Sequence, residues 1–230
     1  MSLHNEHFYN KSTRRYTVAF GNIFNSIYVV RYGEDGIETK REKVPLSYGP
    51  KQKYLYRLEQ NPDLNEKFAI KLPRISFELV QIKYDSSRKS PSTNKLRSEV
   101  ITDGSKSYQY NAVPYEFIFD VNIMAKNTDE ALQIIEQILP FFTPDYTMTI
   151  NIMPELGHKL DIPVVINSIV TDDNWDTAFK ERRNIIWNIN MSLKGFLYAP
   201  THTSKIILEA DWDISGFDGS EYSHGIETEK

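Results

Sequence analysis

Side chains that commonly perform chemistry are few in this sequence, and their spacing predicts no reaction. There is no cysteine, which excludes disulfides and thiolate metal sites. Four of the five histidines lie in terminal segments, and the fifth lies in a predicted turn: His4, His7, His202, His224 and His158, respectively. None of the five is expected to share a face with a pair of carboxylates. His4 and His7 have an i, i+3 spacing that would bind a metal only weakly, so we interpret these two as surface residues.

Nucleophilic and phosphate-binding motifs are also missing. No serine or threonine lies in a nucleophile-elbow sequence, so no nucleophile–base pair is predicted. Gly33 and Gly36 have the spacing of a hairpin turn and not that of a dinucleotide-binding loop. We therefore predict no catalytic residue, no metal site and no cofactor.

Two charged clusters each allow a functional interpretation and a purely structural one. Asp172, Asp173 and Asp176 superficially resemble a calcium loop, but the required glycine and bidentate glutamate are not at the right offsets, so we predict a polar connection between strands. Arg182 and Arg183 would grip a carboxylate of a neighbouring protein. They would equally well pair with nearby acids of this chain, and the sequence leaves both interpretations open.

Charge is unevenly distributed along the chain, whose net charge is −4. Residues 201–230 carry seven acids and two lysines, whereas residues 1–200 carry 25 bases and 24 acids. A nearly neutral body argues against nucleic-acid binding, which needs a clustered basic face. The acidic tail would be held by something basic, and we expect it to lie on a neighbouring subunit or another partner.

Localisation is constrained by what the sequence lacks. No run of 18 or more apolar residues is present, so no membrane span is predicted. The polar residues 1–15 lack the apolar segment of a secretory signal. The missing cysteine suits assembly in a reducing cytoplasm. The 14 tyrosines and 12 phenylalanines suit strands and a core, or alternatively large protein-contact surfaces.

The first half of the chain predicts two helices and several strands. Ser12 or Thr13 is expected to cap a helix that runs to about Asn25. A hairpin follows, with strands at 27–32 and 37–47 joined by a glycine-containing turn. Residues 51–60 have the pattern of a short helix, and residues 74–84 that of a long strand. The polar segment 85–107 is either a solvated loop or hairpin arm, or a docking arm.

The second half contains the clearest helix and the longest strand. Residues 115–125 alternate between apolar and polar side chains, which indicates a half-buried strand. Asn127 and Glu130 have capping-box spacing before an apolar helical stripe that ends near Phe142. Strands are predicted at 146–153, 162–170 and 183–198, and the last is long enough that we expect it to project or to bend at Gly195.

These elements predict an α+β fold, a mostly antiparallel β-sheet with two or three helices packed on one side. Residues 1–200 are expected to form a single domain with a long loop or arm at 85–107. Residues 201–230 would form a separate acidic C-terminal tail.

Several segments in order along the chain form a distinctive set. They are residues 8–16 and 20–25, Val44-Pro-Leu-Ser-Tyr48 with Lys51, Leu72-Pro-Arg-Ile75, the strand 115–123, Ile134-Ile-Glu-Gln-Ile-Leu-Pro-Phe-Phe-Thr-Pro144, Arg182-Arg183 with Trp187, and Gly195-Phe-Leu-Tyr-Ala-Pro200. Together they resemble the tail sheath stabiliser and completion proteins of T-even-like contractile-tailed bacteriophages. The resemblance is weakest at 85–107 and beyond Pro200. It implies a structural virion protein without enzyme activity or cofactor.

The resemblance further implies a homohexameric ring at the head-proximal end of the tail. Such a ring would sit on the tail terminator, hold the last sheath subunits and face the neck proteins. The candidate protein contacts are nine charged residues: Arg14, Arg15, Arg88, Lys89, Arg182, Arg183, Glu209, Asp211 and Asp213. The alternatives are the tail terminator itself and, from other classes, a single-stranded nucleic-acid binder or an enzyme with an unrecognised site.

Overall fold

The computed structural model describes residues 7–33, 35–60, 71–91, 93–97, 105–153, 158–173, 185–200, 202–205, 213–215 and 221–223. By backbone contacts the chain divides into two compact units. The larger unit, here called the body, comprises residues 9–89 and 113–197. The end unit comprises residues 1–8, 90–112 and 198–230, so the predicted loop and the predicted tail fall together.

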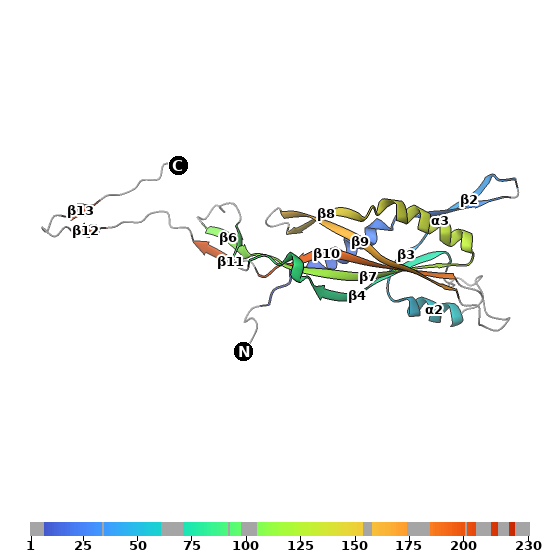
Figure 1. Ribbon diagram of the computed structural model, residues 1–230, viewed down its shortest axis with the longest axis horizontal. Coiled ribbons are helices and arrows are strands. Elements are labelled where there is room, and N and C mark those ends of the chain that lie inside the picture. The colour runs from blue at the N-terminus through green and yellow to red at the C-terminus, as the bar shows by residue number, and fades with distance from the viewer. Residues whose placement is uncertain are drawn as a thin grey trace. The chain divides into compact units, whose positions relative to one another are not determined.

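A six-stranded sheet forms the centre of the body (Figure 1). Its strands, in spatial order, are β3 (Leu46–Tyr48), β4 (Arg74–Tyr84), β7 (Val113–Ala125), β10 (Ile185–Leu197), β9 (His158–Asp173) and β8 (Asp145–Met153). All neighbours pair antiparallel except β3 and β4, which are parallel. The α+β, mostly antiparallel fold predicted from the alternating sequence is confirmed.

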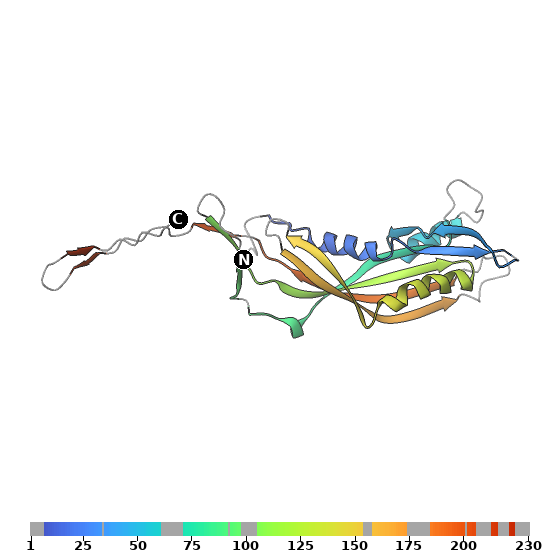
Figure 2. The same ribbon diagram turned by 90° about the horizontal axis from the view of Figure 1, so that it is seen from above.

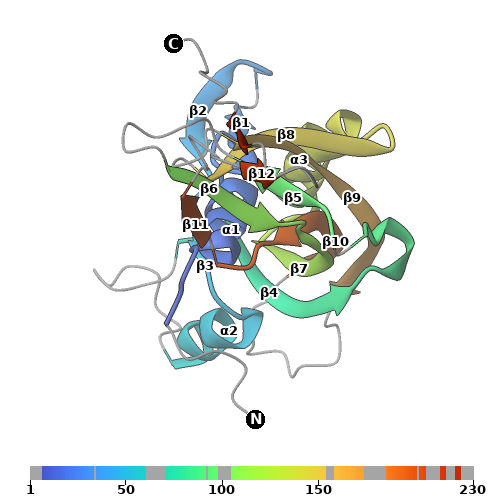
Figure 3. The ribbon, with the colours of Figure 1, turned by 90° about the vertical axis from the view of Figure 1, so that its left-hand side faces the viewer.

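Two helices pack on one face of this sheet. Side chains of a strand alternate between faces, and β7 directs Phe117, Phe119, Val121 and Ile123, all fully buried, to the face here called the covered face. The helix α1 (Ser12–Ile23) lies on it, with Phe20 stacked on Phe119 at a centroid distance of 4.1 Å. The helix α3 (Thr128–Ile138) contacts β7 and β10 of the same sheet. Both helices lie along the strands in Figure 2, and Figure 3 shows the sheet curving around them.

The helix α2 (Lys51–Gln60) packs elsewhere, at one end of the sheet. Its Tyr54 forms a buried cluster with Leu72, Met124 and Ile186. Met124 and Ile186 are opposite each other in the β7–β10 register and alternate with the residues of the covered face. The helix α2 therefore packs against the opposite side of the sheet, and α1 and α3 are the helices that pack on the covered face.

A missing side chain at Gly195 lets α1 approach the sheet closely. A Cβ atom at this position would lie 2.9 Å from the rings of both Tyr16 and Phe117. The Tyr16 hydroxyl donates to the Phe196 carbonyl at 2.6 Å and accepts from the Phe196 amide at 3.0 Å. Strand β10 continues through Gly195 to Leu197, and the glycine allows this close packing of the helix on the sheet.

A two-stranded hairpin extends the body, formed by β1 (Tyr28–Tyr32) and β2 (Glu38–Lys43). Gly36 in its turn has a φ of +71°, which favours glycine. Two glutamines of α3 bind the free edge of β1: Gln133 accepts from the Val30 amide and donates to its carbonyl, and Gln137 does the same for Tyr28. The side-chain amides thus take the place of a neighbouring strand.

Three local expectations were wrong. The predicted strand 37–47 is split at Val44-Pro45, because β3 leaves the hairpin to pair with β4. Lys11, with a φ of 56°, occupies the N-cap of α1, and no side chain caps that helix end. Asn127 does precede α3, but it makes no side-chain cap bond.

The end unit contains short strands. β5 (Lys95–Arg97), β6 (Ser105–Tyr110) and β11 (His202–Lys205) form a three-stranded sheet in the order β11-β6-β5. β12 (Asp213–Ser215) pairs antiparallel with β13 (Glu221–Ser223). The described parts of the segment 85–107 thus include hairpin strands. Among the described helices of both units, none has the length and apolar character needed to cross a membrane.

Candidate protein-interaction surfaces

A basic groove lies between α1 and the outer strand β8, with a volume of about 510 Å³. Its basic residues are Lys11, Arg14 and Arg15, its apolar residues are Val18, Ala19 and Ile150, and its amides are Asn22 and Asn151. Residues 11, 14, 15, 18 and 22 recur at helical spacing, so α1 presents them on a side different from its buried aromatic residues. Two of the predicted contact residues, Arg14 and Arg15, therefore line one site.

The charge of this groove is positive. Within the described part of the chain, neither the Lys11 nor the Arg14 side chain forms an ion pair. The first turn of α1 contains no acidic residue, and the amides of a helix N-terminus add further positive potential. Val18 is 57% exposed beside these cations. The groove thus suits an acidic segment that also carries apolar side chains.

Arg88, another predicted contact, is bound within the body. Its Nε donates to Asp85 Oδ2 at 2.6 Å, its Nη1 donates to the Lys194 carbonyl at 3.1 Å, and its guanidinium lies over the Phe196 ring at 5.0 Å. The hydrogen bond from Arg88, supported by that from Ser87, holds the pKa of Asp85 well below its usual range. Arg88 therefore anchors the start of the predicted arm, and the neighbouring Lys89 is the exposed cation.

The other predicted contact residues lie mainly outside the described residues. These are Arg182, Arg183, Glu209 and Asp211. Asp213 lies in β12, opposite Ser223 of β13.

The aspartate cluster is described in part. Asp172 and Asp173 end β9, and Asp172 lies 4.0 Å from the Lys51 ammonium. Among the described residues, no three His, Asp or Glu side chains gather as a metal site would require. His158 begins β9 and so lies in a strand and not in a turn.

A hydrogen-bonded polar row crosses the sheet on the side opposite the covered face, here called the polar face. Asn190 donates to Asp120 at 2.7 Å and accepts from Asn167 at 2.8 Å, and Asn188 donates to Asn122 at 2.9 Å. Sequence reasoning identified the alternating polar residues of both strands but missed that they meet. The signal was the same alternation of apolar and polar residues in β7 and β10.

Glu78 of β4 stands opposite Asp120 in the register of the polar face. Partial burial, and secondly the charge of Asp120, raise the pKa of Glu78 above its ordinary value. Two neighbouring carboxylates make this part of the polar face acidic.

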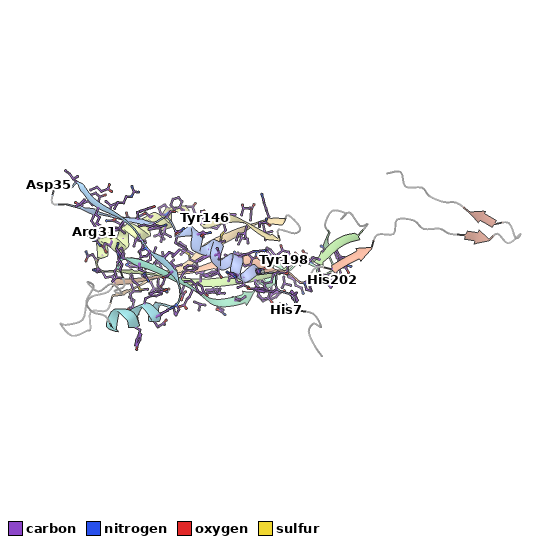
Figure 4. The ribbon with its side chains drawn as sticks, turned by 180° about the vertical axis from the view of Figure 1, so that it is seen from behind. His7, Arg31, Asp35, Tyr146, Tyr198 and His202 are labelled. Atoms are coloured by element: carbon purple, nitrogen blue, oxygen red, sulfur yellow. The ribbon has the colours of Figure 1, made fainter. Side chains whose placement is uncertain are left out.

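The hairpin β1–β2 is fixed to α3 by an ion pair as well as by the glutamines. Arg31 Nη2 lies 2.8 Å from Glu130 Oε1, and Glu130 is buried. Glu130, predicted to complete a capping box, thus binds a residue of the hairpin instead. Figure 4 shows Arg31 on the hairpin and Asp35 at its tip. Tyr32 and Ile37 near the tip are 65% and 70% exposed, which offers apolar contact surface.

Two strand edges of the sheet are open within the described residues. β8 pairs with β9 alone, and β4 beyond Phe77 pairs only with β7, because β3 covers only Ile75 to Phe77. Val80, Ile82 and Tyr84 on this part of β4 are 56%, 44% and 43% exposed. Proteins usually protect such edges, so open edges with apolar side chains indicate contact with another chain.

Comparison with known proteins identifies two relationships. A family model described as T4-like virus Myoviridae tail sheath stabiliser matches residues 7–226. The tail completion protein gp15 of Enterobacteria phage T4 is 30% identical to this chain over 215 residues, which cover 90% of this chain and 77% of that protein.

Proposed function

Because the chain belongs to the T4-like tail sheath stabiliser family and is a structural tail protein, we propose that it forms a homohexameric ring at the head-proximal end of a contractile tail. The ring sits on the tail terminator, holds the last ring of sheath subunits and presents a surface to the neck proteins. It is assembled in the host cytoplasm and catalyses no reaction. The family match does not favour the tail terminator or nucleic-acid binder that the sequence left as alternatives.

The observation that carries the ring is the pair of open strand edges. A closed ring of identical subunits needs two different surfaces on each subunit, one that meets the next subunit and one that meets the previous one. Four successive antiparallel pairings lead from β4 through β7, β10 and β9 to β8. Because this number is even, β4 and β8 run in the same direction. Rotation about an axis along the strands would bring the β4 edge of one subunit beside the β8 edge of the next.

The exposed side chains support this contact. Val80 and Ile82 would remain partly in water on an isolated subunit, and a neighbour would bury them at about 25 cal/mol per Å² of apolar area. The count of six rests on the family resemblance. We further propose Lys89, Arg182 and Arg183 as contacts to sheath or neck proteins.

Light scattering and tail binding test this proposal. We expect a mass of six times the 26.8 kDa chain, and binding to the ends of tails with extended sheath. The Ile82→Asp variant should weaken the ring, whereas Leu132→Asp on α3, which changes a similarly exposed side chain (40% against 44%), should not. A strictly monomeric chain at high concentration without affinity for tail ends would contradict the proposal. Binding to bare tubes alone would indicate a terminator.

A further inference from the structure

We propose that the groove between α1 and β8 binds the acidic C-terminal segment of a neighbouring copy of this chain. The strands β12 and β13, with the residues beside them, would be the bound part. This inference rests on the proposed ring for its neighbour and adds a receiving site and a ligand.

Charge is the first argument for this pairing. The groove presents the cations of Lys11, Arg14 and Arg15, whereas residues 201–230 carry seven acids and two lysines. Single exposed ion pairs contribute little, so stable binding requires several of them together. Three cations on one side of a helix meet this requirement when the ligand carries acids at close intervals. The segment does so at Glu209, Asp211 and Asp213.

Apolar complementarity is the second argument. The groove contains Val18, Ala19 and Ile150 beside its cations. In the acidic segment, apolar residues are interspersed with the acids: Trp212, Ile214, Phe217 and Tyr222. A purely electrostatic partner such as a phosphate backbone would leave the apolar wall exposed, whereas this segment would bury it.

Size and shape restrict which part of the segment binds. A volume of about 510 Å³ is typical of a site that takes a few side chains and not thirty residues. β12 and β13 are extended, and an extended peptide has backbone groups that Asn22 and Asn151 can bind. The segment around Trp212 and Ile214 combines acids with apolar side chains in its sequence and includes the extended strand β12, so we assign it to the groove.

Position favours a neighbouring copy as the donor. Ile150 and Asn151 belong to both the groove and β8, the open edge on which the proposed ring places the next subunit. A neighbour on that edge would therefore bring its own segment close to the groove.

Disulfide trapping tests the contact directly, and the cysteine-free chain makes it specific. Asn151→Cys and Ser215→Cys are prepared as two separate full-length proteins, mixed and oxidised. We expect a disulfide-linked dimer of the two variants. The control pair, Glu136→Cys with Ser215→Cys, should not cross-link, because Glu136 is an exposed residue of α3 outside the groove. Cross-linking inside one chain carrying both cysteines, without any between chains, would overturn the neighbour as donor.

Peptide binding tests the groove without requiring a ring. The probe is a labelled synthetic peptide of residues 206–230, added to full-length chain carrying Glu209→Gln, Asp211→Asn and Asp213→Asn. Lys11→Glu with Arg14→Glu should weaken binding by at least about fivefold, and added salt should weaken it too. The Lys126→Glu control changes an exposed lysine elsewhere and should bind normally.

The two proposals fail in different ways. A hexamer without cross-links or peptide binding would overturn the groove assignment and leave the ring standing. A monomeric protein that still binds the peptide through Arg14 would support the groove and overturn the ring. Displacement of the peptide by a single-stranded oligonucleotide at equal concentration would show general anion binding and overturn the acidic segment as the specific ligand.

Discussion

The two faces of the central sheet are built from alternate residues of the same strands, yet their side chains differ in burial and in polarity. On the covered face, Phe119 and Met191 are completely buried, and Phe119 stacks on Phe20 of α1. On the polar face, their chain neighbours Asp120 and Asn190 join in a hydrogen-bonded row that remains partly exposed. The covered face therefore holds the aromatic core beneath α1. The polar face holds this row of polar groups and, at one end, the apolar cluster beneath α2.

The difference also guides where we propose contact surfaces. The covered face is occupied by helices, so the contacts that we propose with other subunits use the edges β4 and β8, the hairpin β1–β2 and the outer side of α1. The hydrogen bonds of Gln133 and Gln137 to the backbone of β1 show how this fold protects a strand edge from pairing with another chain. The edges without such protection are the ones that we assign to the ring.

Truncation on the covered face should have the largest effect. Phe119→Ala removes a ring that stacks on Phe20 in a fully buried site, and it should lower the free energy of unfolding by about 3–5 kcal/mol. Urea unfolding followed by tryptophan fluorescence measures this change. A loss below about 1 kcal/mol would mean that the covered face is not the core.

Overpacking at the α1 contact should be the next largest effect. Gly195→Ala places a Cβ atom 2.9 Å from the rings of Tyr16 and Phe117, which should cost about 1–3 kcal/mol. Lys194→Ala is the matched control, because its side chain points to the polar face. Equal stabilities of these two variants would contradict the close helix–sheet approach.

A change in the polar row should cost less. Asn190→Ala removes one hydrogen bond to Asp120 and one from Asn167, and partial exposure lets water replace both. We expect a loss of about 1 kcal/mol in the same unfolding experiment. A loss as large as that of Phe119→Ala would show that both faces stabilise the fold equally.

The smallest effect should be a pH-dependent one at Glu78. Its pKa is raised in the folded chain, so the folded state holds the proton more tightly than the unfolded state does. Stability is therefore lost as the pH rises from the ordinary value of 4.5 through the raised one. Glu78→Gln removes this loss and should be slightly more stable than the parent at pH 7, with little difference at pH 4. A Glu78→Gln variant that is less stable than the parent at pH 7 would contradict the raised pKa of Glu78.

Much of the fold follows from local patterns in the sequence. The alternation in 115–125 and the apolar stripe after Asn127 predicted β7 and α3 closely, because burial on one face imposes the period of each element. The apolar stripe of α1, with Tyr16 and Phe20, was predicted for the same reason.

Features that depend on distant residues could not be predicted. Glu130 has the spacing of a capping box, but the nearby Arg31 of the hairpin gives it a stronger, charged partner. Arg88 belongs to a basic stretch, yet its hydrogen bonds to the carbonyls of Lys194 and Tyr115 depend on how the strands pair. The basic groove likewise exists only because α1 lies beside β8, so its charges were visible in the sequence but their common site was not.

Cryo-electron microscopy of intact tails carrying this protein tests the central claim most directly. The account predicts six copies in a ring at the head-proximal end, next to the last sheath subunits, with the β4 edge of each copy against the β8 edge of the next. A map that places the protein at the opposite end of the tail, or in a ring whose subunits meet through neither edge, would contradict it.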